Sequence, residues 1–145
     1  MKKLLFAALL AVSLATTAFA GGTNVNISVL NSFKSEFSKA ANVSWVSKDT
    51  YAKATFTLDN VKMEAFYTAQ GELIGTSKGI SLESLPVSAK RTFAKKYPGY
   101  TVKEVIYFEK SDDAAYFFSA ENDTESIIFK VGQNDQLTTF QQTKK

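Results

Sequence analysis

Apolar residues recur along the chain at two spacings, and the longer spacing predicts two helices. In the segment 27–41, Leu30, Phe33, Phe37 and Ala40 recur every three or four residues and would form one face of an amphipathic helix. The polar residues between them would face solvent. This pattern predicts a first helix that ends near Asn42.

The segment 81–100 predicts a second helix. Ala89, Phe93 and Tyr97 recur every four residues and would form its apolar face, and Pro98-Gly99 would end it. Ser84 is the predicted N-cap, and Pro86 suits the first turn of a helix because its ring fixes φ.

Alternation of apolar and polar residues, with many aromatic and β-branched side chains, predicts eight strands. Asp59-Asn60 and Gln70-Gly71 lie between such segments, where hairpin turns are expected. The segment 114–120 has no charged residue and is predicted to be an interior strand under a helix. The eight predicted strands are 43–48, 51–58, 61–69, 72–76, 101–110, 114–121, 125–132 and 136–142.

The order helix then strands occurs twice. An offset of about 60 places Phe33 on Phe93 and Phe37 on Tyr97. A helix with a short meander exposes an apolar sheet face, which two such units could cover together. The predicted fold class is therefore α+β, with duplicated helix-plus-antiparallel-meander units and the helices packed on one face of an antiparallel sheet. The two repeats would span about 25–80 and 81–143.

The first twenty residues have the pattern of a secretory leader. A basic start at Lys2 and Lys3 precedes an apolar run, and Ala18-Phe19-Ala20 provides small residues for cleavage. We therefore expect residues 1–20 to be a signal peptide, and residues 21–145 to be a single exported domain that is periplasmic or secreted. After cleavage no stable membrane insertion is expected, because no other apolar run is long enough to span a bilayer.

Charge and composition exclude several classes of function. The 17 Lys and Arg residues include two in the leader, and 14 Asp and Glu oppose them. The exported domain is thus nearly neutral, which argues against a nucleic-acid partner. The chain has no His and no Cys, so imidazole bases, thiol nucleophiles and His/Cys metal sites are excluded. We predict no enzymatic activity and no cofactor.

The placement of aromatic, Gly and Pro residues resembles a known group of proteins. The matching stretches are "NVSW" after the first helix, the hairpin "VKMEAFYTAQGELIG", and "LPVSAKRTFAKKYPGYTVKEV". They are similar to the PepSY-like small exported proteins of the Bacteroidetes, whose tandem fold is related to that of the β-lactamase-inhibitor protein. The resemblance implies a periplasmic or outer-surface domain with an inhibitory or peptide-binding role. It supplies no site residues.

Four aromatic residues are the candidate partner-binding residues. Trp45, Tyr51, Tyr67 and Tyr107 lie in predicted strands beside polar residues, and each combines a flat apolar body with a hydrogen-bond donor. We therefore predict a non-enzymatic binding module that engages an unknown protein or peptide of the envelope through an exposed sheet face or an edge strand. The alternative is a small apolar-ligand or lipid carrier, with a cavity between sheet and helices lined by Phe37, Phe93 and Ile128.

Overall fold

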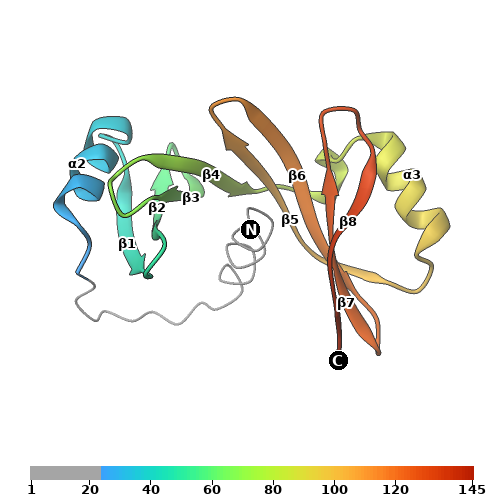
Figure 1. Cartoon of the computed structure of the whole chain (residues 1–145). Coiled ribbons are helices and arrows are strands. Elements are labelled where there is room, and N and C mark those ends of the chain that lie inside the picture. The colour runs from blue at the N-terminus through green and yellow to red at the C-terminus, as the bar shows by residue number, and fades with distance from the viewer. Residues whose placement is uncertain (1–23) are drawn as a thin grey trace.

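The computed structural model describes residues 24–145, which form one antiparallel sheet of eight strands with two short helices (Figure 1). The helices are α2 (Ile27–Glu36) and α3 (Val87–Lys96), and a 3-10 turn, η1 (Leu82–Ser84), precedes α3. The strands are β1 (Ala41–Ser47), β2 (Ala52–Leu58), β3 (Val61–Tyr67), β4 (Leu73–Gly79), β5 (Thr101–Lys110), β6 (Asp113–Glu121), β7 (Glu125–Val131) and β8 (Leu137–Lys144). The predicted leader lies outside the described residues.

The strands lie in the sheet in the same order as in the sequence, and each pairs antiparallel with the next. Short turns make this possible. Between β2 and β3, Leu58 faces Val61, and the two turn residues Asp59 and Asn60 both have positive φ, at 49° and 64°. Positive φ at both central residues is what a two-residue type I′ hairpin requires, and Asp and Asn tolerate it better than most residues. The expected turn is therefore confirmed.

The predicted fold class was wrong. All eight strands belong to one continuous sheet, and within residues 24–145 the two α-helices have only ten residues each. The sheet does not divide into separate meander units, because Thr76–Gly79 of β4 pair with Ile106–Glu109 of β5. The molecule is a sheet-dominated structure with two small helical covers. The uncharged segment 114–120 belongs to β6, which is an interior strand, as expected, because it lies between β5 and β7.

Helix α2 packs on β1, β2 and β3. Val29 and Phe33 are its buried residues, and they meet Ala54, Phe56 and Ala65 of the sheet. The helix ends earlier than predicted, at Glu36, where the N–H of Phe37 donates to the carbonyl of Phe33. Asn42 was the expected end, but it has a φ of 54° beside a bulge in β1, so it belongs to the strand and not to the helix.

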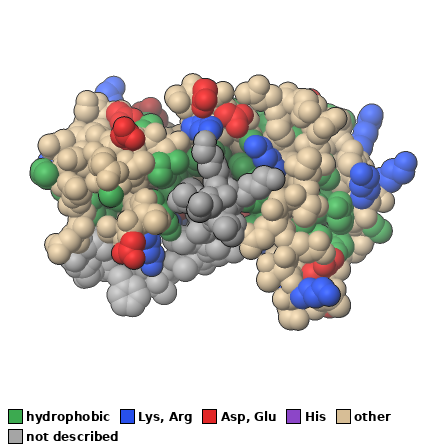
Figure 2. Space-filling model, in the orientation of Figure 1, with side chains coloured by type: hydrophobic (Ala, Val, Ile, Leu, Met, Phe, Trp, Pro, Cys, Tyr) green, Lys and Arg blue, Asp and Glu red, His purple; other side chains and the backbone are tan. Residues whose placement is uncertain are grey.

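Helix α3 packs on the same face at the other end of the sheet. Ala89 and Phe93 meet Phe118 and Phe129, so the helix covers β6 and β7. Its outward side is basic, with Lys and Arg side chains gathered at that end of the molecule (Figure 2). The predicted N-cap was wrong: Ser84 ends the 3-10 turn and Pro86 occupies the cap position of α3.

The Tyr67 hydroxyl is an unpaired polar group in the core under α2 and lowers the stability of that core. The side chain is 0% exposed, and among residues 24–145 its hydroxyl has no hydrogen-bond partner. Burial raises the pKa of Tyr67 above its ordinary value of 10.0, and the Glu36 carboxylate contributes to this rise. A buried polar group without a partner costs about 1–3 kcal/mol.

We expect Tyr67→Phe to raise the free energy of unfolding by about 1 kcal/mol, because the ring stays and the unpaired hydroxyl is removed. Urea denaturation would measure the change. Tyr100→Phe is the matched control, since the Tyr100 hydroxyl donates to the Glu125 carboxylate, and it should give no gain. A loss of stability in Tyr67→Phe would mean that the hydroxyl has a partner in solution.

Candidate functional site

The face of the sheet opposite α2 and α3 is rich in aromatic residues, and we call it the aromatic face. The register assigns side chains to it: Ser77 pairs with Phe108 and Ile106 pairs with Phe117, so these side chains share one face. No residue of α2 or α3 belongs to the apolar cluster there. That cluster consists of Tyr51, Phe66, Ile106, Phe108, Ala115 and Phe117, with Ile74, Ile128 and Phe140 packed against it.

Five aromatic rings of this cluster form an unbroken row across the sheet. The centroid separations along the row are 6.4 Å for Tyr51 and Phe66, and 6.2 Å for Phe66 and Phe108. They are 6.5 Å for Phe108 and Phe117, and 5.3 Å for Phe117 and Phe140. Tilted and edge-to-face pairs at such distances add to the stabilisation from burial alone. The row runs from the start of β2 to β8.

Gly75 allows the ring of Phe108 to lie across β4. A Cβ atom at Gly75 would come within 2.5 Å of the Phe108 ring, so only glycine leaves room for it. Gly75 also pairs with Phe66, the next ring of the row. The glycine in "ELIGT", predicted only to lie in a strand, therefore permits the contact between the rings of β3 and β5.

Charged residues lie at the margins of the aromatic face and pair with one another. The Lys53 ammonium lies 3.3 Å from the Glu64 carboxylate, and both side chains are largely buried. The Lys130 ammonium lies 4.0 Å from the Asp113 carboxylate and 5.9 Å from the centre of the Phe117 ring. These pairs frame the apolar row with both signs of charge.

Two hollows lie along β5 on this face. A small pocket of about 70 Å³ is lined by Phe108, Phe117 and Phe140 together with the charged residues Lys110, Asp113 and Lys130. A larger groove of about 410 Å³ is lined by Lys62, Glu64, Ser77, Gly79, Glu104 and Ile106. Residues 104, 106 and 108 alternate onto the aromatic face, so β5 connects the larger groove to the smaller pocket. Together they could hold an extended chain.

The four predicted binding residues do not lie together. Tyr51 belongs to the aromatic row. Trp45 and Tyr67 lie under α2, with the Trp45 ring 5.2 Å from that of Phe33. Tyr107 lies on the helix side of β5, beside Tyr116 at 5.2 Å and beneath the Lys78 ammonium at 5.7 Å. Tyr51 lies on the aromatic face but is only 4% exposed, and Tyr67 under α2 is 0% exposed. A binding role for any of the four remains a prediction.

Apart from Tyr51, none of the rings of the aromatic face was among the predicted binding residues. A signal for it exists in β6, where Phe117 and Phe118 are neighbours and both are buried, at 3% and 2% exposure. Neighbouring strand residues point to opposite faces. Two adjacent phenylalanines in an interior strand therefore indicate a sheet that is apolar on both sides.

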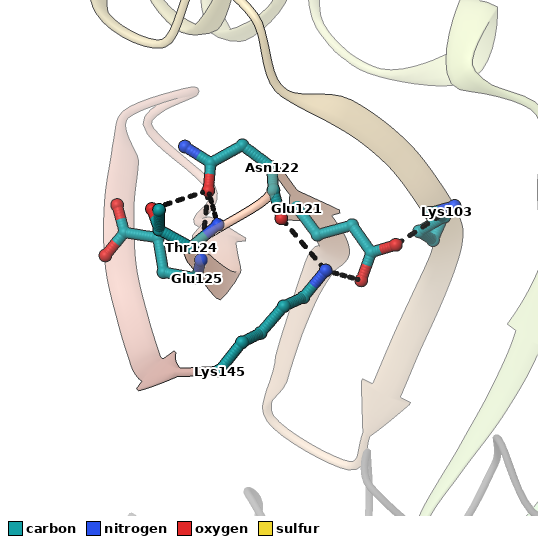
Figure 3. A network of polar contacts seen from close by, with 6 residues as sticks. All are labelled: Lys103, Glu121, Asn122, Thr124, Glu125 and Lys145. Carbon is teal, nitrogen blue, oxygen red and sulfur yellow. Dashed lines mark hydrogen bonds and ion pairs between the residues drawn. The ribbon is translucent and has the colours of Figure 1, made fainter.

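A polar network lies at one end of the sheet and includes the turn between β6 and β7 (Figure 3). The Glu121 carboxylate lies 3.0 Å from the Lys103 ammonium and 3.2 Å from that of Lys145. Hydrogen bonds from these two lysines hold the pKa of Glu121 below its usual range. The Asn122 side-chain oxygen accepts hydrogen bonds from the backbone N–H groups of Thr124 and Glu125. These bonds stabilise the turn between β6 and β7, so the network has a structural role.

Among residues 24–145, no three His, Cys, Asp or Glu side chains come close enough together to bind a metal ion. Neither helix in this part of the chain is long and apolar enough to cross a bilayer.

Comparisons with known proteins connect the fold to solved structures. No family model matches the chain, and no curated protein matches it in sequence. A DUF2874 family protein from Bacteroides ovatus has a similar structure, with a TM-score of 0.72 and 20% identity over 85% of this chain and 89% of that one. A candidate periplasmic protein from Bacteroides eggerthii gives 0.72 and 14% identity, over 84% and 90% of the two chains.

A BLIP-like protein from Bacteroides fragilis is also similar, with a TM-score of 0.68 and 16% identity over 86% of this chain and 89% of that one. At such identities the likeness concerns the fold alone. The PepSY-like assignment is not shown by these comparisons. The chain has a BLIP-like fold, shared with proteins of Bacteroides.

Proposed function

We propose that the chain is an exported, non-enzymatic binding protein that holds a segment of a partner protein against its aromatic face. The observation that supports this most is the row of five rings from Tyr51 to Phe140, in which Phe140 is half-buried and the other four rings, 2–6% exposed, support it from within the face. An antiparallel sheet that packs helices on one face is commonly polar on the other. Here the second face is aromatic as well, although neither described helix packs there.

Aromatic rings are suited to this role. Phe and Tyr provide large contact areas and lose little conformational entropy on binding, since each has only two side-chain torsions. Rings near the centre of an interface are typical hot spots. The half-buried residues Ile74, Ile128 and Phe140 extend the apolar surface around the row. Of the four predicted contact residues, only Tyr51 belongs to this cluster, and it is a buried member of it at 4% exposure.

A periplasmic or secreted location fits this role. The predicted leader indicates export, and one structural neighbour is described as a candidate periplasmic protein. One structural neighbour is described as BLIP-like, which is consistent with a protein as the partner. Once the partner is identified, we propose to test whether binding inhibits it.

The packing argues against the alternative of a lipid carrier. A carrier needs roughly 300 Å³ or more between helices and sheet. Phe37 and Phe93 were predicted to line this space, but their rings pack directly on the sheet. The ring centroids are 4.9 Å apart for Phe37 and Phe56, and 5.2 Å apart for Phe93 and Phe118. Ile128 lies on the aromatic face, so it cannot line the same space.

Site-specific photo-crosslinking would test the proposed function. A benzophenone side chain would replace Phe140 on the aromatic face, or Val87 on the outer surface of α3 as the matched control; Val87 is 58% exposed. We expect irradiation of envelope extract to give one major adduct from position 140 and none of that mass from position 87.

Competition would establish that the adduct forms at a specific surface. An excess of unlabelled wild-type protein should abolish the adduct. At least about tenfold more Phe140→Ala protein should be needed for the same effect, since truncating an interface ring that contributes strongly to binding costs more than about 1.4 kcal/mol. An adduct from position 87 that behaves identically, or no adduct from position 140, would contradict the proposed surface.

A further inference from the structure

An excess of positive charge lies at one end of the domain, on and beside helix α3. Segment 81–100 contains four basic residues and one acidic residue. The rest of residues 21–145 contains 11 basic and 13 acidic residues, so the excess there is negative. The near neutrality of the whole domain therefore conceals a separate basic end, where Lys and Arg side chains gather (Figure 2).

Three of these four basic residues lie on the outer side of α3, and we call them the basic ridge: Arg91, Lys95 and Lys96. All three are exposed. Arg91 and Lys95 follow Val87 at intervals of four residues, so they lie on the side of the helix opposite Phe93, whose ring packs on the sheet. Val87 is 58% exposed, so an apolar side chain lies in line with the cations.

The fourth basic residue holds a second apolar group beside this ridge. The Lys90 ammonium donates to the backbone carbonyl of Glu83 at 3.0 Å, which ties the 3-10 turn η1 to α3. Leu82 of this turn is 40% exposed. The basic end of the molecule therefore combines exposed cations with two exposed apolar side chains.

The fold does not account for the charge of the basic ridge. Within residues 24–145, none of its three side chains forms an ion pair. Lys95 and Lys96 lie in the last turn, where the helix dipole favours cations. Arg91 lies in the middle of the helix, and like charges four residues apart, such as Arg91 and Lys95, repel each other. Helix α2 packs on the same face of the sheet with one basic and one acidic residue, so packing there needs no excess of positive charge.

The shape and chemistry of this end suit a flat anionic surface. The groove and the pocket described above contain no residue of α3, so the ridge is the outer side of a helix and not part of a hollow. Lys and Arg carry their charges on long apolar stems and provide only hydrogen-bond donors. Cations are attracted to a surface of anionic lipid headgroups, and neighbouring apolar side chains can enter the boundary between headgroups and acyl chains.

We infer that the domain docks on anionic membrane surfaces through the basic ridge, with Val87 and Leu82 in contact with the lipid boundary. The docking is peripheral, since neither described helix is long and apolar enough to cross a bilayer. Because α3 lies on one face of the sheet, the aromatic face is directed away from the membrane. The inference goes beyond the proposed function and does not depend on it.

Co-sedimentation with lipid vesicles tests this inference on protein purified after export. One set of vesicles contains phosphatidylcholine alone, and the other also contains about 30% phosphatidylglycerol, which supplies the anionic headgroups. At an ionic strength of about 0.1 M we expect binding to the second set to be at least about tenfold stronger. Raising the ionic strength to about 1 M shortens the Debye length from about 10 Å to about 3 Å and should abolish this difference.

Two triple variants of equal net charge show whether the location of the charge matters. The first replaces the three residues of the basic ridge by glutamine, and the second replaces three exposed lysines at the other end of the molecule. They are Arg91→Gln/Lys95→Gln/Lys96→Gln and Lys34→Gln/Lys39→Gln/Lys48→Gln. None of the six residues forms an ion pair within the described part of the chain, so both variants should fold as the wild type does, which thermal melts would verify.

The two variants should differ in vesicle binding. Each cation near an anionic surface contributes roughly fivefold to binding. The ridge variant should therefore bind phosphatidylglycerol vesicles at least about tenfold more weakly than the wild type, and the control variant less than about threefold more weakly.

Equal binding of the two variants, or no preference of the wild type for the anionic vesicles, would overturn the inference. Retention of the wild type by soluble polyglutamate, without binding to vesicles, would also overturn it and would indicate an acidic protein segment as the partner of the ridge. None of these results affects the proposed function, because photo-crosslinking from position 140 reports on the opposite face of the sheet.

Discussion

Replacing Phe129 by alanine is expected to lower the free energy of unfolding by about 3–5 kcal/mol. Phe129 is 0% exposed, and its ring lies 4.7 Å from Tyr97, 5.0 Å from Phe118 and 5.5 Å from Phe93. Truncation removes the contact area and leaves a cavity between α3 and the sheet. Single domains are stable by only about 5–15 kcal/mol, so a large part of the total would be lost.

Urea denaturation followed by the fluorescence of Trp45 would measure this effect. Val87→Ala is the matched control, because Val87 is 58% exposed and removal of its methyl groups should change stability by less than about 0.5 kcal/mol. A loss in the free energy of unfolding below about 1 kcal/mol for Phe129→Ala would contradict this expectation. It would mean that α3 moves to fill the cavity, or that α3 packs less tightly on the sheet than the ring contacts indicate.

Gly71→Ala is expected to lower the free energy of unfolding by about 2–4 kcal/mol, because two costs add at this residue. Gly71 has a φ of 91°, which side-chain-bearing residues rarely adopt. A Cβ atom would also lie 2.7 Å from the Ser28 carbonyl oxygen of α2, which is too close for any relaxed contact. The same turn is tied to α2 by the Ser32 hydroxyl, which donates to the Gly71 carbonyl at 2.7 Å.

Gly79→Ala is the control for this substitution. No atom of the described residues lies within 4 Å of a Cβ atom at Gly79, and its φ is not positive. We expect it to be neutral or slightly stabilising, because alanine restricts the unfolded chain more than glycine does. Equal effects of the two substitutions on chemical denaturation would show that the contact between the β3–β4 turn and α2 has no energetic importance.

The strands could be predicted from the sequence because their signal is local. Alternating residues and turn residues such as Asp59 and Asn60 placed all eight strands to within a few residues of their observed bounds. The helix boundaries were less predictable. Phe37 and Ala40 continue the helical spacing of Phe33, but the chain turns after Glu36 to start β1, and no local pattern announces that turn.

The faces of the sheet could not be assigned from the sequence, since alternation divides a strand into two sets of residues without saying which set a helix covers. Tyr67 shares its face with Ala65 and Ala54, where small side chains leave room for α2. Phe66, one residue earlier, falls on the aromatic face. The choice depends on where the helices dock, which is a tertiary property. The extents of the leader and of the two repeats remain predictions.

The order of the strands also has a consequence for how fast the chain folds. Every strand pairs with its neighbour in sequence, so most contacts join residues close together along the chain. Local contacts cost little loop-closure entropy, and domains built from them fold faster than other sheets of similar size. Hairpins such as β2–β3 can form within microseconds. The pairing of β4 with β5 must enclose segment 80–100, including α3, so we expect it to be the slow step that turns two groups of hairpins into one cooperative sheet.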